Sequence, residues 1–208
     1  MKKNCISASF VAVFTQALPV IPPLDNKFCK DLFGLPYDTI NGLTNEGYII
    51  AIENKPMPSV TITPQKIVVK AQSVLDLATY VDSLAKEFKS KGIPMASSAY
   101  GINTEYQWLD LNSPSSEWMW NRFINPAMAT ATMNQCNKVS FRFVVNDSEA
   151  VNMEFMPRVG INDGIFASVN HHHAIGLNEF PTQGLLKVMF DDSQRLLEKI
   201  FFPTIIGE

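Results

Sequence analysis

The stretch SVTITPQKIVVKAQSVLDLATYVDSLAKEF, residues 59–88, decides the fold class because its pattern changes midway. Its first half holds two runs rich in β-branched residues, separated at Thr63-Pro64, and such runs are typical of strands. Its second half begins at Ser73, whose hydroxyl can cap a helix, with Asp76 three residues later. The stretch therefore predicts two strands followed directly by a helix.

Two segments have the apolar spacing of amphipathic helices, in which residues three or four apart share one face. The first begins at Ser73 and ends before Gly92, because this glycine and the nearby Pro94 stop a helix. The second covers residues 182–201. The apolar faces consist of Leu77, Val81, Leu84 and Phe88 in the first helix and of Leu185, Leu186, Met189, Leu196, Leu197 and Ile200 in the second.

The remaining segments favour strands joined by short turns. Residues 5–14 alternate between two sets of side chains, as a half-buried strand does. A short helix is predicted after Ser113 as N-cap, with Pro114 at its first position. The predicted fold class is therefore α+β, with a mainly antiparallel sheet and the two amphipathic helices packed on one face. Further strands are predicted at 47–54, 97–111, 137–145, 149–157 and 164–174.

The composition is typical of a globular protein. The 208 residues, 46% hydrophobic and 18% charged, suit a single α+β domain over 1–208, with an organisation in two halves, 1–112 and 113–208, as an alternative. The formal net charge of −3 and the lack of a Lys/Arg run argue against a nucleic-acid partner. Because no apolar run approaches the roughly 20 residues of a membrane span, we expect no membrane contact.

The three cysteines bear on the cellular compartment. Cys5, Cys29 and Cys136 are scattered and form no C-x-x-C, so reduced thiols in a cytoplasmic protein are the simplest interpretation. Residues 1–17 also begin with two lysines and an apolar segment, as a secretory signal does. The alternation within residues 5–14 favours a strand instead, and both interpretations stay open at this point.

Three consecutive histidines, His171, His172 and His173, are the only ones in the chain. On a strand, His171 and His173 point to one face about 7 Å apart, and His172 points to the other. Two such imidazoles can share a transition metal such as zinc, but a stable site needs a third ligand. The alternatives are acid–base chemistry, or a half-exposed strand whose imidazoles only pack and hydrogen-bond.

The sequence fixes no third ligand by its spacing. We therefore expect no cofactor and no effect of added metal. If a metal does bind, its affinity should fall as the pH drops through about 6.5, and His172 should be dispensable. The candidate third ligands are Asp163, Glu154, Cys136 and Asp147.

Aromatic side chains are concentrated within residues 100–123. One interpretation is a large aromatic core at a junction between helix and sheet. The other is a partner-binding surface, because aromatic residues and arginine are enriched where proteins contact one another. The candidate partner-binding residues are Trp118, Trp120, Arg122, Tyr106 and Trp108.

Common catalytic motifs do not occur in the sequence. It has no H-E-x-x-H, no paired C-x-x-C, no G-x-S-x-G and no phosphate-binding glycine loop. This absence favours a non-catalytic binding or assembly protein that contacts a protein partner or associates with itself. The alternative is a metal-dependent enzyme that uses the strand with His171 and His173.

Three segments resemble a sporadically distributed group of uncharacterised prokaryotic proteins. They are the proline-flanked LPVIPPLDNKF (18–28), VTITPQKIVVKA (60–71), and AYGINTEYQW (99–108) after the capped helix. In that group a strand leads into a helix and then into a strand with a small-residue signature of Gly and Asn type. The resemblance covers roughly the first half of the chain and implies the same order of elements. The group has no agreed activity or catalytic residues.

Overall fold

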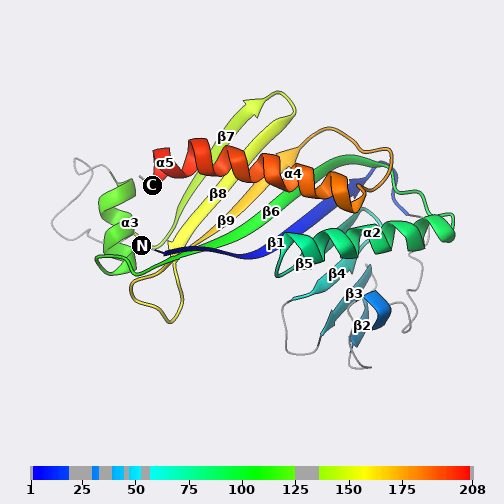
Figure 1. Cartoon of the computed structure of the whole chain (residues 1–208), viewed down its shortest axis with the longest axis horizontal. Helices are drawn as coiled ribbons and strands as arrows, with labels where there is room; N and C mark the ends of the chain where they lie inside the picture. The colour runs from blue at the N-terminus through cyan, green and yellow to red at the C-terminus, as the bar shows by residue number, and fades with distance from the viewer. Residues whose placement is uncertain are drawn as a thin grey trace.

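The computed structural model of the chain describes residues 2–18, 30–32, 39–44, 47–52, 57–124 and 136–206. Within these residues, nine strands form one sheet in which every neighbouring pair is antiparallel, in the order β2-β3-β4-β5-β1-β6-β9-β8-β7 (Figure 1). The predicted α+β class with an antiparallel sheet is thus confirmed. The strands are β1 (Lys2–Phe14), β2 (Thr39–Thr44), β3 (Gly47–Ile52), β4 (Ser59–Ile62), β5 (Lys66–Ala71), β6 (Ser97–Leu109), β7 (Val139–Asn146), β8 (Glu149–Pro157) and β9 (Ile165–His173).

The central position in the sheet belongs to β1, which pairs with β5 on one side and β6 on the other. Its even-numbered residues Ala8, Phe10 and Ala12 are buried, as the alternation of residues 5–14 predicts. Strands from both halves of the sequence are neighbours in one continuous sheet, because β6 pairs with β9. Loss of residues 1–17 would remove the central strand.

The turn at Pro64 and the strand β2 show what local patterns do and do not reveal. Between β4 and β5, the Thr63 amide donates to the Lys66 carbonyl at 2.8 Å, so Pro64 lies in a tight turn and not in a ladder.

Strand β2 was not predicted, because TINGLT contains Asn and Gly, which are depleted in strands. Between β1 and β2, the described residues 30–32 include the buried Leu32.

The first amphipathic helix, α2 (Val74–Ser90), begins as predicted. The Ser73 hydroxyl accepts from the Asp76 amide at 3.1 Å, and Leu77, Val81, Leu84 and Phe88 are buried. This cap satisfies one of the amides at the helix start that have no partner within the helix. Its apolar face joins side chains of β1, β4 and β5 in one core cluster, which also takes in residues from the second amphipathic helix.

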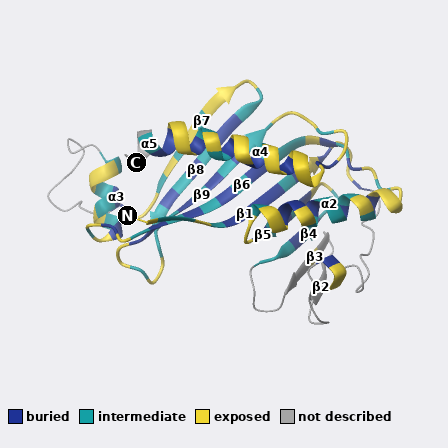
Figure 2. Cartoon of the chain, viewed as in Figure 1, coloured by how far each residue is buried: buried dark blue, intermediate teal, exposed yellow. Residues whose placement is uncertain are grey.

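That second helix, α4 (Gln183–Leu196), begins at the N-cap Thr182 and continues as the π-helical turn η2 (Leu197–Phe201) and the short α5 (Phe202–Ile205). Leu186 and Phe190 contribute to the core cluster of α2, while Leu197 and Phe202 belong to a second cluster with β6, β8 and β9. Helix α4 contacts both α2 and β6. Figure 2 shows exposed residues along the outer surfaces of α2 and α4, with buried and intermediate residues in the strands behind them.

The short helix α3 (Ser115–Phe123) begins later than predicted. Pro114, with φ −52° and ψ 140°, is its N-cap, so the expectation of Ser113 at that position is wrong. The extended ψ of Pro114 delays the first helical residue to Ser115, whose hydroxyl donates to the Asn162 and Gly164 carbonyls at 2.7 Å each. None of the helices among the described residues has a stretch long and apolar enough to cross a bilayer.

The face of the sheet opposite to Ile102 and His171 carries a row of hydrogen-bonded polar side chains. Asn103 Nδ2 donates to the Ser9 hydroxyl at 3.1 Å, Asn170 Nδ2 donates to Asn103 Oδ1, and Asn152 Nδ2 donates to Asn170 Oδ1 at 3.4 Å. These four residues are register partners on β1, β6, β9 and β8. The row satisfies amides that a half-buried sheet face would otherwise leave without partners.

Candidate functional site

Strand β9 places two of the three histidines in one pocket. His171 and His173 line it together, whereas His172, on the other face of the strand, does not. This is the arrangement that the alternation of a strand predicts. His171 is 4% exposed, which is unusual for a group that can carry a charge and indicates that its ring nitrogens have protein partners.

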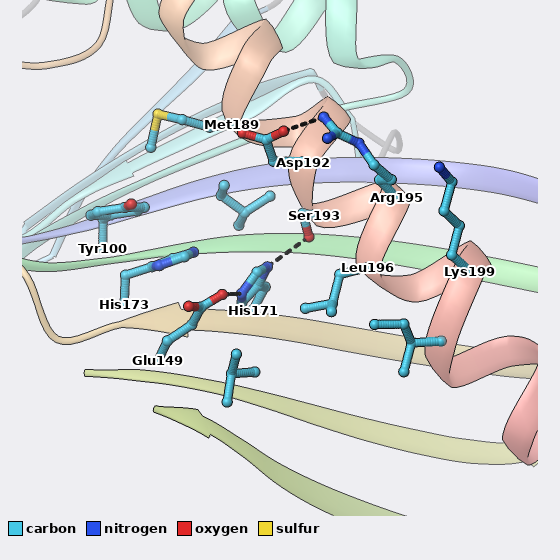
Figure 3. Close-up of a pocket in the computed structure, with 13 residues that line it drawn as sticks. Tyr100, Glu149, His171, His173, Met189, Asp192, Ser193, Arg195, Leu196 and Lys199 are labelled. Carbon is cyan, nitrogen blue, oxygen red and sulfur yellow. Dashed lines mark hydrogen bonds and ion pairs between the residues drawn. The ribbon is translucent and has the colours of Figure 1, made fainter. Parts of the chain in front are cut away.

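Both ring nitrogens of His171 have such partners. Its Nε2 lies 2.7 Å from Glu149 Oε1, and its Nδ1 lies 2.9 Å from Ser193 Oγ (Figure 3). Glu149 is the first residue of β8 and Ser193 belongs to α4, so the imidazole links the sheet to the helix that lies over it. The second carboxylate oxygen of Glu149 accepts from Asn146 Nδ2 at 2.8 Å, which orients the carboxylate.

His173 lies beside this chain of hydrogen bonds. Its ring stacks on Tyr100, with centroids 4.5 Å apart and 16° between the planes, and its centroid lies 4.3 Å from that of His171. Its Nε2 is buried and has no hydrogen-bond partner in the part of the chain that the structure describes. Burial, helped by repulsion from His171 and opposed by Glu149, lowers the pKa of His173 to about 4. The imidazole is therefore neutral at neutral pH and offers a lone pair.

Glu149, His171 and His173 together form a cluster of metal-ligand type. One donor atom from each residue can be chosen such that all three lie within 4.8 Å of one another. Two imidazoles and one carboxylate are a ligand set of catalytic zinc and of non-haem iron(II), and both leave coordination positions open. Ligand bonds near 2.1 Å would require the three donors to close by roughly an ångström.

The pocket next to this cluster has a volume of about 490 Å³, within the range of small-molecule sites. Figure 3 shows the cluster on the strands and, across from it, residues of α4 and η2. Asp192 and Arg195 form an ion pair at the exposed side of α4. The apolar side chains that line the pocket are Ile102, Val145, Met189, Leu196 and Ile200.

The structure does not bring the predicted third ligands to the histidines. Glu154 pairs instead with Lys138 at 2.9 Å, and Cys136 is buried in the cluster beneath α3. Asp147 and Asp163 are exposed in turns. Glu149, which was not among the predicted ligands, takes the third position because it is the register partner of His173 across β8 and β9.

The aromatic candidates divide into core and surface residues. Tyr106 and Trp108 are 1% and 0% exposed, so they are core residues and do not form part of a partner-binding surface. They lie on the buried face of β6, where edge-to-face contacts with Phe202 hold both rings. Trp118 and Trp120 are partly buried against the same cluster. Arg122 is exposed on α3.

Ser193, His171 and Glu149 also have the residue types of a hydrolase triad. Ser193, however, is 2% exposed and lies within α4, where backbone amides are committed to helical carbonyls. Ser193 lines the pocket, but the helix around it offers no free amides for an oxyanion hole. The hydroxyl therefore positions His171 and does not act as a nucleophile.

The sequence matches no protein-family model, and a search of curated proteins finds no significant match. The geometry of the pocket and its surroundings is therefore the basis for assigning a function to this chain.

Proposed function

We propose that Glu149, His171 and His173 bind a divalent transition metal, with zinc as the first choice, and that the protein is a metal-dependent enzyme. The observation that carries this proposal is the buried, unpartnered Nε2 of the neutral His173 beside the Glu149–His171 pair. A buried nitrogen without a hydrogen bond is costly, and a metal would satisfy it. The proposal replaces the expectation of no metal, which depended on the lack of a third ligand.

The residues around the three ligands support the proposal. Ser193 is within hydrogen-bond distance of His171 Nδ1, and Asn146 donates to Glu149, so two of the ligands are oriented by residues behind them. Metal sites commonly have such orienting partners. A bound metal would supply a Lewis acid and lower the pKa of a coordinated water. We further propose that α2 and α4 form a layer on one face of the sheet, which gives the pocket its helical wall.

Thermal stability in the presence of zinc tests the metal site. At a zinc concentration about one hundred times the dissociation constant, stabilisation of about 2.7 kcal/mol should raise the Tm of chelator-treated protein by roughly 5–10 °C. His173→Ala and Glu149→Gln should lose most of this shift. His172→Ala, on the other face of the same strand, should keep it. Metal analysis of protein purified without an affinity tag should give one metal per chain.

The pH dependence of the zinc-induced rise in Tm reports on the protonation of His173. Because the pKa of His173 is lowered to about 4, its proton should compete with zinc only at pH values well below the 6.5 of an ordinary histidine. His173 should therefore remain available as a ligand at pH 6.

Equal zinc-induced Tm shifts in wild type, His173→Ala and Glu149→Gln would contradict the proposal. A shift that His172→Ala also abolishes would contradict it as well.

Protein–protein contact remains the second candidate function, with self-association as its simplest form. It is supported by a shallow pocket of about 370 Å³ on α3, which Trp118, Arg122, Glu117 and Asn121 help to line. Trp118→Ala should then weaken association measured by light scattering, whereas Trp108→Ala should act only through stability. A wild-type protein that stays monomeric at all concentrations, and shows no partner in a pull-down from its host, would exclude this candidate.

We also propose a cytoplasmic location and membership of the sporadically distributed prokaryotic group. The location is supported by free Cys5 and Cys136. Membership is supported by the three resembling segments, of which 60–71 and 99–108 lie in β4, β5 and β6. Fractionation of the host would test the location, and a structure of a group member with the same strand order would test the membership.

A further inference from the structure

The pocket beside the proposed metal site has an exposed cationic side chain that the metal does not explain. Lys199, on η2, lines the pocket, and the structure shows no ion pair between it and any other described residue. Arg195 lies four residues earlier, but Asp192 neutralises it. The helical wall of the pocket therefore carries one net positive charge, at Lys199.

The space between Lys199 and the cluster is apolar. Figure 3 shows Leu196 between His171 and Lys199, and Ile102 and Ile200 line the same pocket. Lys199 lies six positions after Ser193, which is within hydrogen-bond distance of His171, and at about 1.5 Å per residue this corresponds to roughly 9 Å along the helix. A ligand that reaches from one end to the other therefore has an apolar body of several carbon atoms.

We infer that the pocket binds a monocarboxylate with a short alkyl body, whose carboxylate pairs with Lys199 and whose other end reaches the Glu149–His171–His173 cluster. One lysine neutralises a single carboxylate, whereas a phosphate dianion would leave one negative charge without a partner in a largely apolar pocket. The π-helical geometry of η2 is a second supporting feature, because π-helical turns are frequent at functional sites. The inference names the substrate class of the proposed enzyme, and its ligand anchor does not require the metal.

Calorimetric titration of chelator-treated protein with acetate, butanoate and hexanoate tests the inference. Each added methylene that becomes buried should tighten binding by about fourfold. Hexanamide, which has the same body without the charge, should bind more weakly than hexanoate, as should inorganic phosphate. Lys199→Gln should weaken hexanoate binding by about two- to fivefold, the range for an ion pair made by a solvent-exposed lysine.

The control is Lys187→Gln. Lys187 is an exposed lysine of α4 that lines the groove between α2 and α4 and not this pocket. The Lys187→Gln variant should bind hexanoate as tightly as the wild type does. Equal binding of hexanamide and hexanoate, stronger binding of phosphate, or equal losses in the two lysine variants would overturn the inference. Zinc should still raise the Tm of Lys199→Gln, because Lys199 is not a proposed metal ligand. The metal proposal falls if zinc fails to stabilise the wild type, whether or not hexanoate binding depends on Lys199.

Discussion

Trp108→Ala is expected to lower the free energy of unfolding by about 3–5 kcal/mol, a large share of the 5–15 kcal/mol that stabilises a typical domain. Trp108 is fully buried on β6 and contacts Phe202 edge-to-face, with centroids 5.2 Å apart, and Phe155 at 6.1 Å. Its removal opens a cavity between the sheet and the C-terminal helical segment. Rigid secondary structure on both sides limits collapse of that cavity.

Urea denaturation measures this effect, and Trp118→Ala is the matched control. Trp118 is partly buried on α3, and its Phe123 contact has centroids 5.9 Å apart. We expect its replacement to cost markedly less than that of Trp108. Comparable losses would mean that Trp118 is packed as tightly as Trp108 and would contradict its partly buried position at the edge of the cluster.

Leu84→Ala is expected to cost about 2–5 kcal/mol, because Leu84 is fully buried on the inner face of α2. It packs in the cluster that includes Phe10 of β1 and Phe190 of α4. The loss of stability should appear as a lower urea concentration at the midpoint of unfolding. The dependence of the free energy of unfolding on urea concentration should stay unchanged, since the two-state character of unfolding need not change.

Leu75→Ala gives the control for this change. Leu75 lies on the same helix but is 67% exposed, so its replacement should change stability by no more than about 0.5 kcal/mol. If the Leu75 and Leu84 variants lose equal stability, the helix packs through a different face from the one described.

Elements with local signals could be predicted from the sequence. Helix α2 has its cap, its apolar spacing and its stop within 20 residues, and β7, β8 and β9 were placed within one or two residues of their observed bounds. Strand β2 could not be predicted in this way, because TINGLT gains its pairing from β3 and not from its own residues. Tertiary context overrides weak strand preference in such segments.

The site was predictable only in part. That His171 and His173 share a face follows from the period of a strand, but the third ligand depends on register. The loop 158–164 sets Pro157 opposite Ile165, and the same register then sets Glu149 opposite His173. A register estimate for these two strands would have found Glu149. Ser193 gives no such signal, because its position depends on how α4 lies across the sheet.

The central position of β1 affects how the chain folds during synthesis. Residues 2–14 are synthesised before their pairing partners, because Val11 pairs with Val68 and Gly101, which are translated much later. Contacts between such distant residues slow folding, and an unpaired strand is prone to aggregation until its partners arrive. Phe10 and Phe14 would remain uncovered until β5 and β6 have been made. The strand at the centre of the finished sheet is thus the one that stays exposed longest in the nascent chain.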